Sequence, residues 1–355
     1  MKDKIAVALS GGIDSTVSAW LLKKKGYKLI GLHFLSGYEG YSHEQRLMTA
    51  HERTSKLSDL LEFPVKLIDC SHIFQKEVIE YFLKTYHIGK TPNPCMVCNA
   101  KIKFGFLLSY AKKIGASCLA TGHYARIIKR KERFGLLQGI DLKKDQSYFL
   151  ARLNQDQLKH ACFPLGEMTK EKVRILAAEN RLQPLYKNES QDICFIRHGH
   201  YSDFLNLQEG FNPKSGIIVD PSGKVLGEHK GLHSYTVGQR RGINCPGPEP
   251  YYVLKLDVIE NRLIVGHKKD LLTSWCYTTD INWIQDKGHS KSPFPIEIRV
   301  RYRQKATGAT LFPIDSKRAR INFHKPQYAV TPGQGAVFYH GQEVLGSGWI
   351  TDEGI

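Results

Sequence analysis

The sequence contains no long hydrophobic run. None of its 355 residues belongs to a stretch of the roughly 20 apolar residues that a membrane span requires. The opening MKDKIAVALSGG also lacks the apolar region of a secretory signal. We therefore expect a cytoplasmic protein without a membrane partner.

Acidic residues are few compared with basic ones. Asp and Glu total 34 against 51 Lys and Arg, a formal net charge of +17. Such an excess favours a polyanionic partner, RNA or DNA once a membrane is set aside, although a merely soluble basic protein would have the same composition.

The eight cysteines are not expected to form a structural disulfide framework, because a reducing compartment would not maintain one. Any special pair among them is therefore expected to be catalytic or to bind a metal.

The first part of the chain alternates short β-rich runs with amphipathic stretches, which indicates an α/β fold with a parallel sheet. The expected strands are 4–9, 28–34, 65–69 and 117–121, and the expected helices are 14–25, 43–61, 73–86 and 99–114.

From about Leu207 the sequence becomes rich in Gly, Pro and short alternating runs, which predicts small β-barrels. Expected strands are 251–256, 262–265, 296–302, 320–323 and 336–339. With a second boundary near Trp275, the predicted domains are 1–206, 207–275 and 276–355.

The segment AVALSGGIDST, residues 6–16, predicts a phosphate-binding loop between a strand and a helix. It lacks the lysine of the phosphate-transferring NTPase loop, so the expected chemistry differs. The pattern S-G-G-x-D-S resembles the PP-loop of ATP pyrophosphatases, enzymes that transfer AMP and release pyrophosphate. A purely structural Gly-Gly turn is the alternative.

Cys95 and Cys98 form a C-x-x-C pair in the loop TPNPCMVCN. Zinc would need two more ligands, and an inert buried thiol is a further alternative. A nucleophilic or redox role is favoured because Cys98 is expected at the start of the helix 99–114, where the dipole lowers a thiol pKa. Cys194, in the segment DICFI, would by itself be taken as a core cysteine.

The motifs SGGIDS, TPNPxxxCN, KIKF, TGHYAR, KDQSYFL, DICFI, HSYTVGQRRG and RYRQ follow one another across almost the whole chain. In this combination the sequence closely resembles the tRNA-specific 2-thiouridylases of the MnmA type. The resemblance implies an adenine-nucleotide alpha-hydrolase-like (PP-loop) domain followed by two small β domains. It also implies thiolation of C2 of the wobble uridine in tRNAs for Lys, Glu and Gln, with ATP and Mg²⁺ as cofactors, tRNA rather than DNA as the nucleic acid, and a cysteine desulfurase or sulfur-relay protein as donor.

The resemblance assigns the nucleophile to Cys98 and the persulfide carrier to Cys194. A persulfide on Cys194 would attack C2 directly, or Cys98 would attack that persulfide, release sulfide and leave a disulfide between Cys98 and Cys194. Many relatives have Asp where this chain has Cys95, so the role of position 95 is an open question. ATP-binding residues implied by the resemblance are Ala8, Leu9, Ser10, Gly11, Gly12, Ile13, Asp14, Ser15, Phe34 and Gly122.

Implied tRNA-binding residues are Asn93, Pro94, Cys95, His123, Lys144, Asp145, Gln146, Arg240, Arg301, Tyr302 and Gln334. The stretch 291–325 holds nine Lys or Arg and two acids, which predicts a basic face on the last domain. A solvated basic strand is the alternative there. Two rival functions remain: another PP-loop enzyme that forms amides on small molecules, and a catalytically idle tRNA-binding protein.

Overall fold

Five parallel strands form the sheet of the N-terminal domain. The computed structural model describes residues 3–39, 42–182, 184, 193–196, 199–208, 211–286 and 290–351. The strands are β1 (Lys4–Ala8), β2 (Lys28–Leu35), β3 (Val65–Asp69), β4 (Cys118–Ala120) and β7 (Ala161–Cys162), in the spatial order β3-β2-β1-β4-β7. Ile5, Ala6 and Val7 of β1 are all buried because helices cover both faces of the sheet. The predicted α/β class is confirmed.

Helices follow the strands much as the sequence predicts, with one important difference. The first helices are α1 (Ile13–Lys24), α2 (His43–Leu61) and a continuous stretch made of α3 (Ser71–Phe74), the π-helical η1 (Gln75–Ile79) and α4 (Glu80–His87). The helix predicted for 99–114 instead begins at Pro94 and runs through α5 (Pro94–Cys98), the π-helical η2 (Asn99–Leu107) and α6 (Leu108–Lys113). The shorter helices are α7 (Ser147–Leu150), α8 (Gln155–Lys159), α9 (Lys170–Glu179) and α10 (Tyr201–Asn206).

A small four-stranded sheet forms the central domain. Its strands β8 (Gly216–Val219), β9 (Val225–His229), β10 (Tyr252–Asp257) and β11 (Arg262–Gly266) are arranged in the order β10-β11-β8-β9. Ile218, Val253 and Leu263 are buried between this sheet and its loops, which gives the domain a core of its own.

Six strands close into the C-terminal barrel. They are β12 (Leu272–Trp283), β13 (Phe294–Arg299), β14 (Thr307–Pro313), β15 (Ala319–Tyr328), β16 (Gly335–His340) and β17 (Glu343–Thr351), and the pairing of β12 with β17 closes the ring. Trp275, near which the boundary was predicted, lies inside β12. The hairpin of β5 (Ala125–Arg130) and β6 (Arg133–Gln138) comes from the N-terminal part of the chain but pairs with β17.

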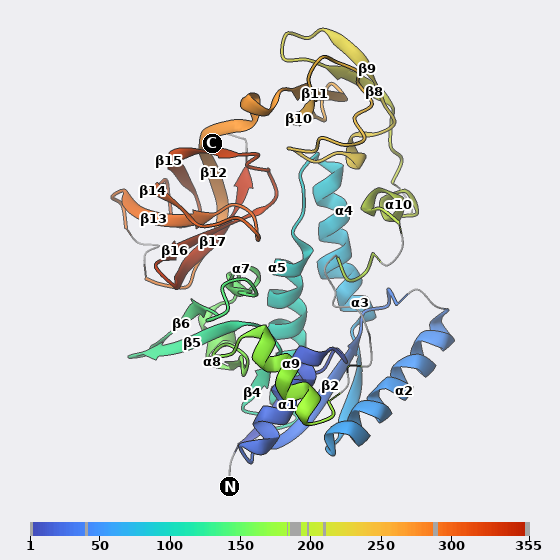
Figure 1. Ribbon diagram of the computed structural model, residues 1–355, viewed down its shortest axis with the longest axis vertical. Helices are drawn as coiled ribbons and strands as arrows, with labels where there is room; N and C mark the ends of the chain where they lie inside the picture. Colours follow the sequence, from blue (N-terminus) through green and yellow to red (C-terminus); the bar gives the residue numbers. More distant parts are fainter. Residues whose placement is uncertain are drawn as a thin grey trace.

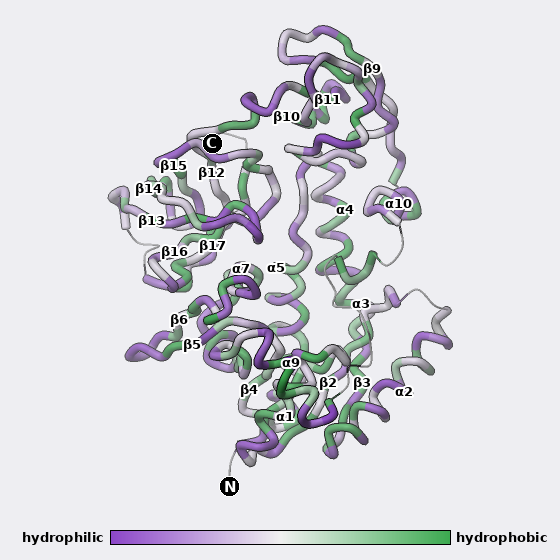
Figure 2. The backbone as a smooth tube through the Cα atoms, viewed as in Figure 1, coloured by the Kyte–Doolittle hydropathy of each residue, from purple (hydrophilic) through white to green (hydrophobic). Residues whose placement is uncertain are grey.

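Figure 1 shows the three sheets at three corners of the molecule, with α4 and α5 running between them. In Figure 2 the strands of the N-terminal sheet and of the barrel carry hydrophobic segments, whereas the tip of the β5–β6 hairpin is hydrophilic. None of the helices in the described ranges is long and apolar enough to cross a bilayer.

Candidate active site

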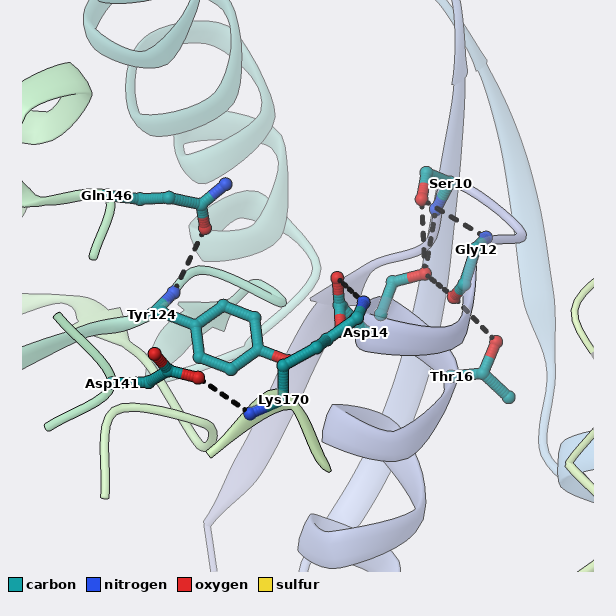
Figure 3. Close-up of polar contacts among 9 residues, drawn as sticks. Ser10, Gly12, Asp14, Thr16, Tyr124, Asp141, Gln146 and Lys170 are labelled. Carbon is teal, nitrogen blue, oxygen red and sulfur yellow. Dashed lines mark hydrogen bonds and ion pairs between the residues drawn. The ribbon is translucent and has the colours of Figure 1, made fainter. Parts of the chain in front are cut away.

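The loop after β1 is shaped to hold an anion. Gly11 has a φ of 82°, a left-handed conformation that suits glycine, and it turns the chain into α1. Gly12 is the N-cap residue, and no side chain caps the first turn of α1. The Ser15 hydroxyl donates to the Gly12 carbonyl at 2.9 Å and accepts from the Ser10 amide at 3.2 Å, which fixes the loop (Figure 3). The helix-start amides are therefore available for phosphate oxygens.

This loop lies where the strand order reverses. The chain moves from β1 to β2 and β3 on one side, and β4 pairs with β1 on the other, so the loops after β1 and β4 meet in the crevice where open α/β sheets bind ligands. Gly122, just after β4, packs closely on the start of α1: a Cβ there would lie 2.8 Å from the Asp14 carbonyl carbon and the Ser15 nitrogen. The predicted residues Ser10 to Ser15 and Gly122 are thus brought together.

Lys170 is a residue of this site that the sequence analysis missed. Its ammonium donates to both carboxylate oxygens of Asp14 at 2.8 Å, and the Tyr124 hydroxyl donates to one of them at 2.7 Å (Figure 3). The Lys170 side chain is only 6% exposed and that of Asp14 33%, so the pair is largely shielded from water. A single lysine at the start of an amphipathic helix carries no sequence signal for this contact.

Two histidines and an aromatic ring flank the loop. His33 lies with Nδ1 2.7 Å from the Leu9 carbonyl oxygen, which joins the ends of β2 and β1. The next residue, Phe34, is half-buried at the end of β2. His123 is buried, its Nδ1 lies 2.7 Å from the Thr121 hydroxyl, and burial lowers its pKa far below the usual range. His123 is therefore a neutral side chain that is only 8% exposed, and its contact with tRNA stays a prediction.

The helix that carries the C-x-x-C pair starts earlier than predicted. The Asn93 side chain accepts from the Met96 amide, and Pro94 occupies the first helical position, which suits proline because that position needs no N–H. Cys95 therefore lies in the first turn, whereas Cys98 lies a full turn inside. The prediction that Cys98 sits at a helix N-terminus is wrong.

The expected lowering of the Cys98 pKa is also wrong. Burial raises the pKa of the Cys98 thiol to about 12 and that of Cys95 to about 11. The ammonium of Lys103, on the π-helical turn that follows, opposes this effect at both thiols, and nearby Cys194 adds to it. Desolvation outweighs the helix dipole here because the dipole acts mainly on the first turn. The resting state thus holds Cys98 as a protonated thiol.

Cys194 lies near Cys95 and Cys98 although it belongs to a distant segment of the chain. It is exposed, and it lies near enough that a charge on it would raise the pKa of Cys98 and Cys95. Its neighbour Phe195 is 5% exposed and anchors the turn in an aromatic cluster. The rings around Phe195, at centroid distances of 5.1 to 6.2 Å, are those of Phe82, Phe204, Phe74 and Tyr38. The fold therefore brings Cys194 within electrostatic range of Cys98, and none of the eight cysteines forms a disulfide.

These environments predict an order of thiol reactivity. Iodoacetamide at neutral pH should label exposed Cys194 well before Cys98, because alkylation requires both access and the thiolate. Labelling of Cys98 should rise roughly tenfold per pH unit above neutrality, since its pKa lies far higher. Peptide mass spectrometry over a time course measures both rates. Equal labelling of the two cysteines at neutral pH would contradict this description.

A loop of the barrel holds the segment in front of α5. The Thr91 amide donates to the Pro332 carbonyl at 2.9 Å, and the Gln334 side-chain amide donates to the carbonyls of Thr91 and Pro92. The Gln334 side-chain oxygen also accepts from the Asn93 side-chain amide at 3.5 Å. Asn93 and Gln334, both predicted to bind tRNA, thus contact each other, and the barrel positions the loop that carries the cysteines.

Asp145 does not have the exposed position that tRNA binding would require. It is 2% exposed, and its carboxylate accepts from the Gly139 amide, from the amide and hydroxyl of Ser147, and from the Arg299 guanidinium at 2.8 Å. The carboxylate is therefore fully engaged within the protein. We correct its role to that of a buried link between the 144–146 loop and the barrel, while its neighbours Lys144 and Gln146 are only partly buried.

The basic residues of 291–325 do not form the single face that was predicted. Arg299 points inward to Asp145, and Arg301 donates to the Val237 carbonyl at 3.0 Å and the Thr331 hydroxyl at 2.7 Å. These bonds join the central domain to the barrel. Arg303 is exposed, as is Arg240 in the central domain. Charge counting could not separate inward from outward guanidinium groups.

Tyr302 lies at the cysteine site. Its ring packs on Phe149 with centroids 4.3 Å apart. Burial raises its pKa, Asp145 and Cys95 add to this effect, and the guanidinium groups of Arg303 and Arg299 oppose it. An aromatic pair beside Cys95 offers a surface on which a base can stack.

Arg303 and Arg301 should therefore behave differently on substitution. Arg303→Gln should weaken tRNA binding and reduce the slope of log affinity against log salt by about 0.7 to 0.9, the value of one phosphate contact. Arg301→Gln should mainly lower the free energy of unfolding, by about 1 to 3 kcal/mol, because a buried carbonyl and hydroxyl lose their partner. Filter binding at several salt concentrations and urea unfolding separate the two effects. An Arg303→Gln slope equal to that of the wild type would contradict the first expectation.

Within the described ranges, no three His, Cys, Asp or Glu side chains gather to hold a metal ion. The C-x-x-C pair is not joined there by further ligands of a zinc site.

Family models match the chain in three successive segments. Residues 3–198 match the model described as tRNA methyl transferase HUP domain, 202–267 the tRNA methyl transferase PRC-barrel domain and 273–350 the Aminomethyltransferase beta-barrel domain. The full-length relatives carry a different name, tRNA-specific 2-thiouridylase MnmA.

One such relative, from Desulfosudis oleivorans, is 47% identical over 98% of this chain and 95% of its own length. Those from Chlorobium phaeobacteroides and Rippkaea orientalis are 44% and 42% identical, and in each case the similarity covers at least 98% of both chains. The similarity thus extends through all three domains.

Proposed function

This chain belongs to the family of tRNA-specific 2-thiouridylases named MnmA and forms 2-thiouridine in tRNA, and we propose how its own residues perform that reaction. It is a tRNA-uridine 2-sulfurtransferase that uses ATP. The target we propose is the wobble uridine of tRNAs for Lys, Glu and Gln, with sulfur supplied by a cysteine desulfurase or a relay protein.

Activation of the uridine takes place at the phosphate loop. ATP, a substrate here, supplies the adenylyl group that converts the uridine O2 into a leaving group. The amides at the start of α1 and the Ser10 hydroxyl bind the phosphates, and Phe34 covers the adenine. Gly122, which has no Cβ, lets the loop after β4 pack directly on the start of α1 beside the phosphate loop. The Asp14 carboxylate is already bound by Lys170 and Tyr124, so we propose that Mg²⁺ enters on the nucleotide phosphates, where it commonly binds.

The uridine must leave the anticodon stack to reach this site. Tyr302 and Phe149 provide the stacking surface beside Cys95, and the barrel loop at Gln334 holds that part of the site in place. We propose that the backbone from Asn93 to Cys95 lies against the extruded base.

Sulfur transfer uses the two cysteines in turn. The terminal sulfur of a Cys194 persulfide attacks C2 of the activated uridine, and AMP leaves. The Cys98 thiolate then attacks Sγ of Cys194, which breaks the S–S bond to the transferred sulfur and leaves 2-thiouridine and a Cys98–Cys194 disulfide. A thiol reductant restores both cysteines with two electrons. Lys103 lies near Cys98 and favours its thiolate, against the effect of burial.

The observation that supports this proposal is that Cys194 lies close enough to Cys98 to affect its pKa although the two are distant in sequence. Nucleoside mass spectrometry of tRNA from cells with and without the protein tests the function: 2-thiouridine derivatives should disappear without it. With purified protein, pyrophosphate release should require tRNA. Release that is equally fast without tRNA would instead indicate a small-molecule ligase.

A further inference from the structure

Strands β12, β15 and β14 present an outer face of the barrel that no function above uses. Residues alternate along them, so that Cys276, Ile321 and Leu311 point into the barrel core. Strand register places the outward residues in two rows of three. The rows are Trp275, Asn322 and Thr310, and Tyr277, Arg320 and Phe312. The face thus holds three aromatic residues and one arginine, with Arg320 placed by register between Tyr277 and Phe312.

Trp275 and Arg320 form the centre of this face. The Arg320 guanidinium lies over the Trp275 ring at 5.3 Å from its centroid, and Tyr277 meets the same ring edge-on at 5.3 Å. Trp275 is 43% exposed, an unusual position for so large an aromatic side chain. Arg320 is exposed and forms no ion pair with a carboxylate in the described part of the chain. Its charge is therefore available to a partner.

The charged residues on and around this face are mainly basic, which favours the binding of a polyanion. None of its six residues is acidic, and the exposed Lys325 lies on the same strand as Arg320. The nearby carboxylate of Asp315 is bound by Arg318 at 2.6 Å. An aromatic ring that stacks on a base, next to a guanidinium that binds phosphate, is the combination used for unpaired RNA nucleotides.

We propose that this face is a second tRNA contact, separate from the cleft that receives the target uridine, in which Trp275 stacks on an unpaired base and Arg320 binds a neighbouring phosphate. It rests on the proposed function in taking tRNA as the partner. Such a contact anchors the substrate without touching the reacting atoms, so it contributes to tRNA affinity and leaves the chemical steps unchanged.

Filter binding of tRNA to Trp275→Ala and Arg320→Gln tests the proposal. Each variant should bind about tenfold more weakly, the value of one stacked base or one well-placed phosphate contact. For Arg320→Gln the slope of log affinity against log salt concentration should fall in magnitude by about 0.7 to 0.9. The KM for tRNA should rise in thiolation assays while kcat stays constant. Both side chains are exposed, and urea unfolding should show unchanged stability.

The chain offers a matched control in Lys24, which lies over the ring of Trp20 at 5.5 Å on α1. Lys24→Gln removes the same kind of cation–ring contact elsewhere and should leave tRNA affinity and slope unchanged. Affinities of Trp275→Ala and Arg320→Gln within twofold of the wild type would overturn the proposal. A change only in self-association, measured by sedimentation, would overturn it as well and indicate a protein interface. Wild-type protein that binds tRNA but forms no 2-thiouridine would refute the proposed function, while these affinity comparisons would still decide the role of the face.

Discussion

Replacement of Cys194 by Ser should abolish sulfur loading and tRNA thiolation together, on the order of a thousandfold or more, because the carrier of the persulfide is lost. Cys98→Ser should also stop thiolation but should still accept sulfur on Cys194. The different burial of the two thiols supports this division: Cys194 is exposed to a donor protein, whereas Cys98 is partly buried with a pKa of about 12.

Radiolabelled sulfur from cysteine, delivered by a desulfurase and located by non-reducing peptide mapping, measures both steps. Cys245→Ser, a partly buried cysteine of the central domain, is the control and should retain loading and thiolation. Label on Cys95, or normal thiolation by Cys194→Ser, would show that the carrier has been wrongly assigned. Turnover also requires direct contact between Cys98 and Cys194, so a trapped disulfide between them should appear when the reductant is omitted.

Replacement of Lys170 by Met should lower the affinity for ATP by about a hundredfold. Without its ammonium, the Asp14 carboxylate faces the incoming phosphates unpaired, and two like charges about 5 Å apart repel by roughly 3 kcal/mol at an effective dielectric constant of about 20. Pyrophosphate release should fall accordingly. The affinity for tRNA should stay unchanged, because the Lys170 side chain is buried and its ammonium is bound to Asp14 rather than open to a nucleic acid.

The double variant Lys170→Met with Asp14→Asn distinguishes charge from folding. Loss of Lys170 alone should lower the free energy of unfolding by about 2 kcal/mol, less than for a fully buried pair because Asp14 is partly exposed. Removing the Asp14 charge as well should recover most of this stability. Lys172→Met, exposed on the same helix, is the control. Equal ATP affinity of Lys170→Met and the wild type would show that Lys170 has no part in the phosphate site.

Several site elements were predictable because their chemistry is local. The S-G-G-x-D-S segment specifies a turn and a helix start with its own backbone, so the sequence sufficed to place the phosphate loop. The place of Gly122 in the site, just after β4, followed from the rule that ligands bind at the carboxyl ends of parallel strands. The start of α5 was misread although Asn93 followed by Pro94 is a favourable cap, because the prolines were taken as loop stiffeners.

Contacts between distant segments could not be predicted. Lys170 and Asp14 are 156 residues apart, and the link from Arg299 to Asp145 spans 154. The Lys170–Asp14 contact depends on how α9 packs on α1, and the Arg299–Asp145 contact depends on how the barrel packs on the N-terminal domain. Neither packing arrangement leaves a periodic pattern in the sequence. The basic stretch shows the same limit, since Arg299 and Arg301 serve inside the protein while Arg303 and Arg320 face solvent.

The sequence by itself determined the α/β class, the phosphate loop and the family, because these depend on local backbone chemistry and on the order of motifs, whereas the sulfur-bearing roles of Cys98 and Cys194 are a proposal that follows from the family. Only the tertiary structure decided that Asp14 is neutralised by Lys170, that the Cys98 thiol is held protonated, and that a barrel loop fixes the segment before α5. The reason is that a pKa and an ion pair depend on burial and on which groups lie nearby, and both are set by packing between segments far apart in the chain.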